Sequence, residues 1–281
     1  MQITIEHNGR TFRCDTQQAR SLAITLDFDG PQPNHFGTDK ATREVLKLNG
    51  FTGSTEAGGS CNVDTLAMIP HCNGTHTETV SHIVDEDIWV GHAGMDVVGL
   101  AVLMSVPIAS AADIIAEGSE SYRPPLDKED GLITAANLQH VWARLIGRQQ
   151  LRPQALIIRT LPNDANKRSR AYVEGQQPAF LTVEAMQWVL DHDIQHLLVD
   201  VPSVDRMYDD GLLTNHHLFW RVPEGTHSVT EQTRQDRTIT EMVFADDDLV
   251  DGIYLLNLQV PAFASDAAPS RPILMPLTAG G

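Results

Sequence analysis

The pattern of residues 154–205 predicts a strand, a helix and a second strand in succession, and this order restricts the fold more than any other feature. QALIIRT at 154–160 and QHLLVDVPSVD at 195–205 are apolar runs with the length of buried strands. LTVEAMQWVLDHD at 181–193 has a helical pattern, with Thr182 as the expected N-cap. Strand–helix–strand units of this kind are typical of parallel sheets covered by helices. The sequence therefore predicts an α/β protein.

The other segments add a helix and several strands toward the two ends of the chain. ITIEHNGRTFRC at 3–14 predicts a hairpin that turns at Asn8-Gly9. Helices are also expected at 38–50 and 132–149, and strands at 22–28, 97–108, 238–244 and 252–260. Because no internal repeat or linker is evident, we expect one α/β or α+β domain over residues 1–281.

Composition limits what such a domain binds. A hydrophobic fraction of 42% in 281 residues is enough for one large buried core. The formal net charge of −17 repels phosphate backbones and anionic headgroups, so neither nucleic acid nor a membrane is an expected partner. The longest apolar stretch, Val97 to Ile108, is too short to cross a bilayer. We therefore expect a small-molecule substrate.

The cysteines indicate the redox setting. The chain has three cysteines, Cys14, Cys61 and Cys72, and a small, odd number does not make a disulfide framework. The N-terminal residues show no basic segment followed by an apolar one, as a secretory signal would. These two observations predict a cytoplasmic protein.

Residues 70–82, PHCNGTHTETVSH, concentrate side chains that bind metal ions. Cys72, His76, Glu78 and His82 offer thiolate, imidazole and carboxylate, the usual ligands of first-row metals. Gly74 would let the backbone bend close to an ion. The chain contains 12 histidines, however, so a local cluster also arises by chance. Spacing alone leaves both a metal site and a chance cluster open.

The same segment resembles the signature of the cyclase family, which includes the bacterial kynurenine formamidases. That signature reads His-x-Gly-Thr-His-x-Asp-x-Pro-x-His. Gly74, Thr75, His76 and His82 match it identically, and Glu78 stands in the place of the Asp. Two positions depart from it, since Cys72 replaces the first His and Val80 replaces the Pro.

The second half of the chain carries further motifs in the order that the family shows. HLLVDVPSVD at 196–205 matches a strand that leads into a Pro-Ser-x-Asp-like loop. NHHLFW at 215–220 and TITEMVF at 238–244 match a His before an apolar run and a Glu in an apolar strand. The resemblance thus implies that His216 and Glu241 complete the metal site, with His217 as the competing choice for the former.

The resemblance also implies a fold and a reaction. The fold would be the swivelling β/β/α type in a single domain. Cys72, His76 and Glu78 would hold one Zn²⁺, and Glu78 would bridge to a second ion held by His216 and Glu241, with Mn²⁺ as an alternative metal. His82 would be the catalytic histidine. The reaction would be hydrolysis of an amide or formamide bond, as in an arylformamidase acting on an N-formylkynurenine-type substrate, by a homodimer or homotetramer.

Alternatives remain open at both levels. Cys72 could be no ligand, so that one metal position is lost, or neighbouring His71 could substitute for it. At the level of function, the chain could be a non-catalytic relative that binds a metal or a small molecule. It could also be a cyclase, a lactone hydrolase or a cyclic-imide hydrolase on the same scaffold.

Overall fold

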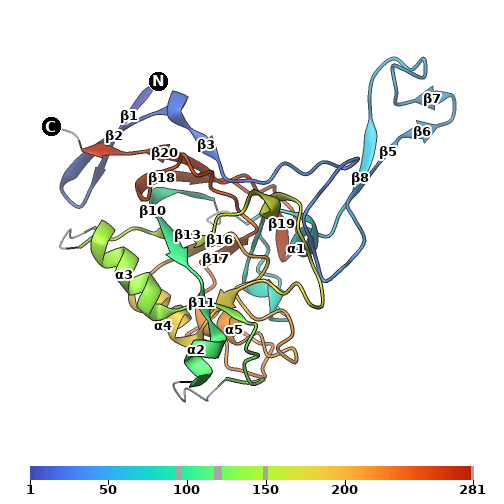
Figure 1. Ribbon diagram of the computed structural model, residues 1–281. Helices are drawn as coiled ribbons and strands as arrows, with labels where there is room; N and C mark the ends of the chain where they lie inside the picture. The colour runs from blue at the N-terminus through green and yellow to red at the C-terminus, as the bar shows by residue number, and fades with distance from the viewer. Residues whose placement is uncertain (93–95, 117–121, 148–150, 280–281) are drawn as a thin grey trace.

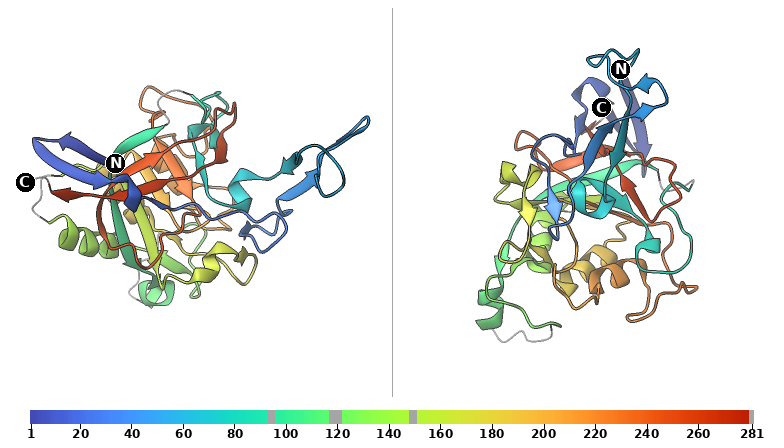
Figure 2. Two further views of the ribbon diagram at one scale, coloured as in Figure 1. Left: turned by 90° about the horizontal axis from the view of Figure 1, so that it is seen from above. Right: turned by 90° about the vertical axis from the view of Figure 1, so that its right-hand side faces the viewer.

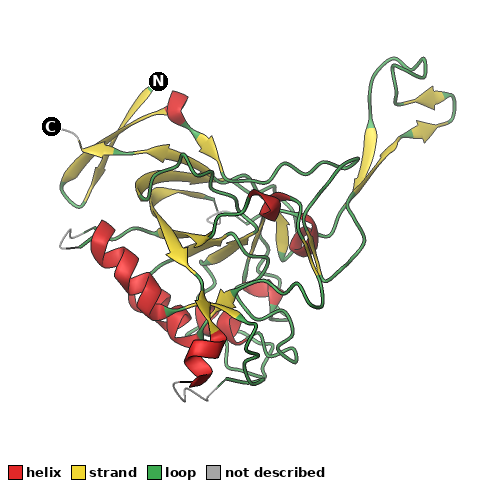
Figure 3. Cartoon of the chain, viewed as in Figure 1, coloured by secondary structure: helices red, strands yellow, loops and turns green. Residues whose placement is uncertain are grey.

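The fold is built around a curled nine-stranded sheet (Figures 1 and 3). The computed structural model describes residues 1–92, 96–116, 122–147 and 151–279. The strands of the main sheet, in spatial order, are β19 (Ala267–Pro269), β9 (His76–Glu78), β17 (Thr238–Glu241), β16 (His196–Val199), β13 (Ala155–Leu161), β10 (Val97–Pro107), β18 (Gly252–Leu258), β20 (Ile273–Pro276) and β3 (Arg20–Ser21).

The centre of the sheet is parallel, as the strand–helix–strand pattern predicts. β10, β13, β16 and β17 run in the same direction. The helices that join them are α3 (Ala135–Leu145), α4 (Val183–Asp191) and α5 (Thr214–Trp220), and Figure 1 shows α3 and α4 side by side against the sheet. Thr182 caps α4 by accepting a hydrogen bond from the N–H of Ala185.

The two faces of these strands bury two different apolar cores. On β13, Leu156 and Ile158 pack toward the helices, while Ala155 and Ile157 pack on the opposite face. Successive side chains of a strand point to opposite faces, so a run that is apolar at every position needs cover on both sides. The continuous apolar sequence at 154–160 therefore specifies a central strand.

The remaining strands and helices form smaller units around the sheet. They are β1 (Gln2–His7), β2 (Arg10–Asp15), β4 (Asn34–His35), β5 (Thr42–Val45), β6 (Lys47–Leu48), β7 (Phe51–Thr52), β8 (Asp64–Ala67), β11 (Ala109–Ser110), β12 (Gly131–Ile133), β14 (Ala171–Tyr172), β15 (Phe180–Leu181), β21 (Thr278–Ala279), α1 (Pro70–Asn73) and α2 (Ala111–Ala116). The predicted hairpin is confirmed, because β1 and β2 pair across Asn8 and Gly9, whose φ angles are 48° and 72°.

The helix expected at 38–50 is wrong. Residues 42–67 instead form a projecting arm, in which β5 pairs with β8 and β6 pairs with β7 (Figures 1 and 2). The partner of Thr42 is Ala67, far along the chain, and a local pattern does not reveal such long-range pairing. Every residue of β5 and β8 is exposed, so the arm adds little to the core.

Two further expectations are corrected or refined. The strand expected at 22–28 is absent, since only an isolated bridge between Ala23 and Val243 occurs in this described segment. The helix expected at 132–149 begins at Ala135 and ends at Leu145, and its last two expected positions lie outside the described residues. Within the described ranges, the helices are all too short or too polar to cross a bilayer.

A pair of leucine substitutions tests this division between core and arm. Leu103→Ala, in β10 at 0% exposure, should lower the free energy of unfolding by about 2–5 kcal/mol, because it leaves a cavity. Leu48→Ala, in the arm at 62% exposure, should change it by less than about 0.5 kcal/mol. Urea denaturation followed by circular dichroism measures both, and equal losses would contradict the fold.

Candidate metal centre

The ladder between β9 and β17 brings the two distant halves of the sequence motif together. The strands run antiparallel, with His76 opposite Glu241 and Glu78 opposite Ile239. His76 and Glu78 are two residues apart, so their side chains lie on the same face of the sheet. His76 Nε2 lies 3.4 Å from Glu241 Oε2. Pairing of backbones thus sets the positions of three predicted site residues.

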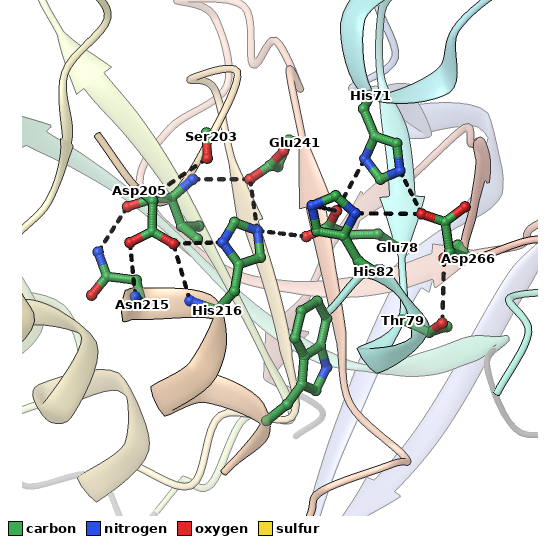
Figure 4. Close-up of polar contacts among 12 residues, drawn as sticks. His71, Glu78, Thr79, His82, Ser203, Asp205, Asn215, His216, Glu241 and Asp266 are labelled. Atoms are coloured by element: carbon green, nitrogen blue, oxygen red, sulfur yellow. Dashed lines mark hydrogen bonds and ion pairs between the residues drawn. The ribbon is translucent and has the colours of Figure 1, made fainter. Parts of the chain in front are cut away.

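Helix α5 adds His216 to this group (Figure 4). His216 Nε2 lies 2.9 Å from Glu78 Oε1 and 3.8 Å from Glu241 Oε1. The other ring nitrogen of His216, Nδ1, lies 2.6 Å from Asp205 Oδ2. His217, the competing choice, turns away, and its Nδ1 contacts the carbonyl of Val222 at 3.2 Å.

The loop after β16 orients both His216 and Glu241 through hydrogen bonds. Asp205 accepts hydrogen bonds from the backbone N–H groups of Asn215 and His216 at the start of α5. The N–H of Val204 donates to Glu241 Oε1 at 2.9 Å. Adjacent residues of one loop therefore orient two side chains of the site, which explains the buried position of Asp205.

His71 lies in the centre, and Cys72 does not. His71 Nδ1 is 3.2 Å from Glu78 Oε2. Three groups of described residues place candidate ligand atoms within 4.8 Å of one another: His71, His76 and Glu78; Glu78, His82 and His216; and His71, His82 and Asp266. None of these groups contains Cys72, whereas two contain His71, so the geometry favours the alternative in which His71 substitutes for it. Residues 70–73 form the helical turn α1, in which consecutive side chains point in different directions.

Asp266 joins the site from the loop before β19. Its Oδ2 lies 2.8 Å from His71 Nε2 and 3.4 Å from His82 Nδ1 (Figure 4). His82 Nε2, on the other side of that ring, lies 3.9 Å from Glu78 Oε2. One carboxylate thus orients both imidazoles, and each presents its second nitrogen toward Glu78.

The hydrogen bonds leave acceptor atoms pointing at one another, which fits a bound cation. His76 Nδ1 donates to the carbonyl of Gly74 at 2.9 Å, so its Nε2 carries a lone pair. His216 likewise donates its Nδ1–H to Asp205, so its Nε2 carries a lone pair, and this lone pair faces a Glu78 oxygen. Among the described residues, His76 Nε2 and Glu78 Oε2 have no hydrogen-bond partner although both are buried. A positive charge beside these atoms, either the proton on His71 or a metal ion, offsets the cost of burying them.

The pKa shifts of Glu78 and His71 also fit a bound cation. Burial acts to raise the pKa of Glu78, but the neighbouring His82 and His216 hold this pKa well below its usual value. Burial acts to lower the pKa of His71, while its contacts with Asp266 and Glu78 raise it to about 10. Glu78 therefore stays ionised, and the proton that His71 holds beside it is one that a metal ion would replace.

Substitution of the two neighbours distinguishes His71 from Cys72. His71→Ala should weaken metal binding by more than about 100-fold, beyond what loss of an outer partner causes. Cys72→Ala should leave the affinity unchanged, because none of the groups of candidate ligands found among the described residues contains Cys72. Competition with a fluorescent chelator measures both affinities. The opposite ranking would restore Cys72 as the ligand.

The contact between Asp205 and His216 is tested by a substitution of equal size. Asp205→Asn should reduce metal affinity by about 10–100-fold, because its one carbonyl oxygen cannot accept from both the Asn215 N–H and the His216 ring, as the two carboxylate oxygens do. The same chelator assay applies, with Asp248→Asn at an exposed carboxylate as the control. An unchanged affinity for the Asp205 variant would show that this hydrogen bond does not orient His216.

Sequence reasoning found part of this site and missed the rest. The structure brings together His76, Glu78, His82, His216 and Glu241, all of which were predicted. The sequence placed Asp205 only in the Pro-Ser-x-Asp-like loop, without a role, and did not indicate Asp266. The Pro-Ser-x-Asp-like loop could have indicated Asp205, whereas SDAAPS around Asp266 carries no comparable pattern.

Residues 10–206 match the family model described as "Cyclase: Putative cyclase". The matched range contains His71, His76, Glu78 and His82, but it ends before His216 and Glu241. The curated proteins include no significant match to the sequence. The assignment of His216 and Glu241 to the site therefore rests on the geometry alone.

Solved structures share the fold at low sequence identity. A predicted metal-dependent hydrolase from Bacillus stearothermophilus is 14% identical, with a TM-score of 0.57 over 92% of this chain and 97% of its own. An isatin hydrolase bound to the product analogue thioisatinate is 13% identical, with a TM-score of 0.59 over 94% of each chain. Isatin hydrolase A from Ralstonia solanacearum is 16% identical, with a TM-score of 0.57 over 92% and 91%. The fold class predicted from the sequence is thus confirmed.

Proposed function

Because the chain belongs to the Cyclase family, we propose that it is a metal-dependent hydrolase that cleaves the C–N bond of an amide or formamide. The observation that carries the proposal is the convergence of unpaired acceptors. His76 Nε2 and Glu78 Oε2 are buried without hydrogen-bond partners in the described structure, beside the carboxylate of Glu241. Buried acceptors of this kind fit a divalent cation, and few other groups would satisfy them.

Two overlapping sets of residues would hold the metal. His71, His76 and Glu78 would bind one ion, and Glu78, His216 and Glu241 would offer a second position. Two imidazoles with a carboxylate suit Zn²⁺, and Mn²⁺ is the alternative. When bound, such an ion supplies Lewis acidity, which polarises a carbonyl and makes hydroxide available near neutral pH.

His82 is the proposed proton carrier. Its ring is 26% exposed, so it borders the solvent side of the centre, whereas His76 and His216 are buried. Asp266 accepts a hydrogen bond from Nδ1–H of His82, so Nε2 of the same ring faces Glu78. Nε2 can therefore take a proton from the attacking water and deliver it to the leaving nitrogen as the C–N bond breaks. The sum of these steps is water plus amide giving carboxylic acid plus amine.

Ring opening of a cyclic imide or lactam is the second candidate. The isatin hydrolases that share this fold favour it, and the same residues would carry the same proton transfers. The two candidates differ only in whether acid and amine remain in one molecule. An arylformamidase-like reaction on an N-formylkynurenine-type substrate is the finer form of the first candidate.

Three further expectations belong to this proposal. The metal would be Zn²⁺, the working form would be a homodimer or homotetramer, and the location would be cytoplasmic. The first rests on the ligand types of the site, the second on the family resemblance, and the third on the sparse cysteines.

The proposal is tested with metal-loaded protein and two substrates. Wild-type protein should hydrolyse N-formylkynurenine or isatin, lose activity after treatment with a chelator, and regain it with Zn²⁺ or Mn²⁺. His76→Ala should remove both bound metal and activity, because it deletes an Nε2 ligand from the centre. Elemental analysis and absorbance assays of the product give the two readouts.

A second variant separates chemistry from metal binding. His82→Asn should keep the metal and lose hydrolysis by about 10²–10⁴-fold, the usual contribution of a positioned proton carrier. Metal bound at full occupancy with no turnover of any amide, imide or lactone would favour a non-catalytic metal-binding relative. Full activity in the His76 variant would exclude the proposed centre altogether.

A further inference from the structure

The segment between α5 and β17, residues 223–237, contacts both halves of the centre, and we call it the strap. Its base is fixed at Trp220. The carbonyl of Trp220 accepts from the N–H of Arg234 at 2.8 Å, and its Nε1 donates to the carbonyl of Arg237 at 2.9 Å. The Trp220 ring lies 5.6 Å from the ring of His216. The base of the strap therefore lies beside a candidate metal ligand.

The middle of the strap binds the residues that follow His82. The carbonyl of His227 accepts a hydrogen bond from the N–H of Asp85 at 2.9 Å. The ring of His227 bonds to the carbonyl of Ile83 through Nδ1 at 3.0 Å. Because a carbonyl only accepts, Nδ1 carries the proton in this bond. One strap residue thus holds the backbone at two positions, one and three residues after His82.

Glu86 provides a contact in the opposite direction. Both of its carboxylate oxygens accept from the N–H of Val229 at 3.2 Å. The Val229 side chain packs against the main buried cluster, which includes Val80 and Ile83 on either side of His82. Polar and apolar contacts therefore join the strap to the turn that carries His82.

The side-chain contacts of His82 are long, so the place of its ring depends on its backbone (Figure 4). Nδ1 lies 3.4 Å from Asp266 Oδ2, and Nε2 lies 3.9 Å from Glu78 Oε2. Most N–H···O hydrogen bonds are about 2.7–3.2 Å long. Contacts as long as these hold an imidazole weakly, whereas the strap bonds directly to the backbone that follows it.

We propose that the strap positions His82 for proton transfer, with His227 and Glu86 as the positioning residues. This inference rests on the proposed function, since it requires His82 to carry the proton. The strap joins the turn of His82 to the surroundings of His216, so it sets the separation of two imidazoles whose ring centres lie 5.3 Å apart. Among the described residues, neither His227 nor Glu86 belongs to a group of candidate metal ligands. The strap should therefore affect the rate and not the metal.

The test measures kcat, KM and metal affinity with whichever of N-formylkynurenine and isatin the metal-loaded wild type hydrolyses. His227→Ala and Glu86→Ala should each lower kcat about tenfold, because displacing a reacting group by a fraction of an ångström slows the reaction. KM and metal affinity should stay unchanged. His140→Ala, at an exposed histidine of α3, is the matched control and should behave as wild type. Thermal unfolding confirms that each variant is folded.

Conservative variants separate positioning from a general weakening of the fold. The side-chain nitrogen of Asn takes the place of His Nδ1, so His227→Asn should restore most of kcat. The nitrogen of Gln takes the place of Nε2, so His227→Gln should remain slow. Glu86→Gln keeps one acceptor oxygen for the N–H of Val229 and should also recover most of the rate. Equal kcat values for the Asn and Gln variants at residue 227 would contradict the proposal.

A double variant shows whether the strap acts through His82. His82→Asn combined with His227→Ala should have the same kcat as His82→Asn alone, because no proton carrier is left to position. A further loss in the double variant would overturn the proposal and leave the hydrolase function standing. So would wild-type kcat in both alanine variants, or a loss confined to KM or metal affinity. A wild type without turnover would refute the proposed function, and this inference with it.

Discussion

The pairing of β9 with β17 is the contact on which the site depends. It joins residues 76–78 to residues 239–241 by backbone hydrogen bonds, so the register alone decides that His76 faces Glu241. A shift of one residue would turn His76 and Glu78 to the opposite face of the sheet. The two strands are short, but each is paired on both sides, β9 with β19 and β17 with β16. The scaffold therefore fixes the ligands before any ion arrives.

Such preorganisation has an energetic cost. Glu78 and His216 are almost completely buried, and moving ionised groups out of water is unfavourable unless partners surround them. Asp205 provides such a partner for His216, Gly74 for His76 and Val204 for Glu241, but the atoms at the centre are left facing one another. The free energy of binding a cation offsets this cost, so the folded state and the metal are thermodynamically coupled.

The sequence predicted what depends on local pattern and on matched motifs. Continuous apolar runs identified β10 and β13, and the signature around His76 identified most residues of the centre. Cys72 stays a prediction, because the direction of its side chain depends on the helical turn α1 and not on the motif. Asp266 was missed because its role comes from packing β19 beside β9, a contact across almost 190 residues. The arm was mistaken for a helix for the same reason, since its pairing is long-range.

The order of strands in the main sheet also has a consequence during protein synthesis. β9 lies between β17 and β19, so side chains near residue 76 find their neighbours only after residues 238–241 and 266–269 have been made. A ribosome-bound chain that ends before these strands carries His71, His76 and Glu78 without the groups that orient them. Capture of the ion is therefore expected to follow synthesis of residues 266–269, rather than to guide the earliest folding of the chain.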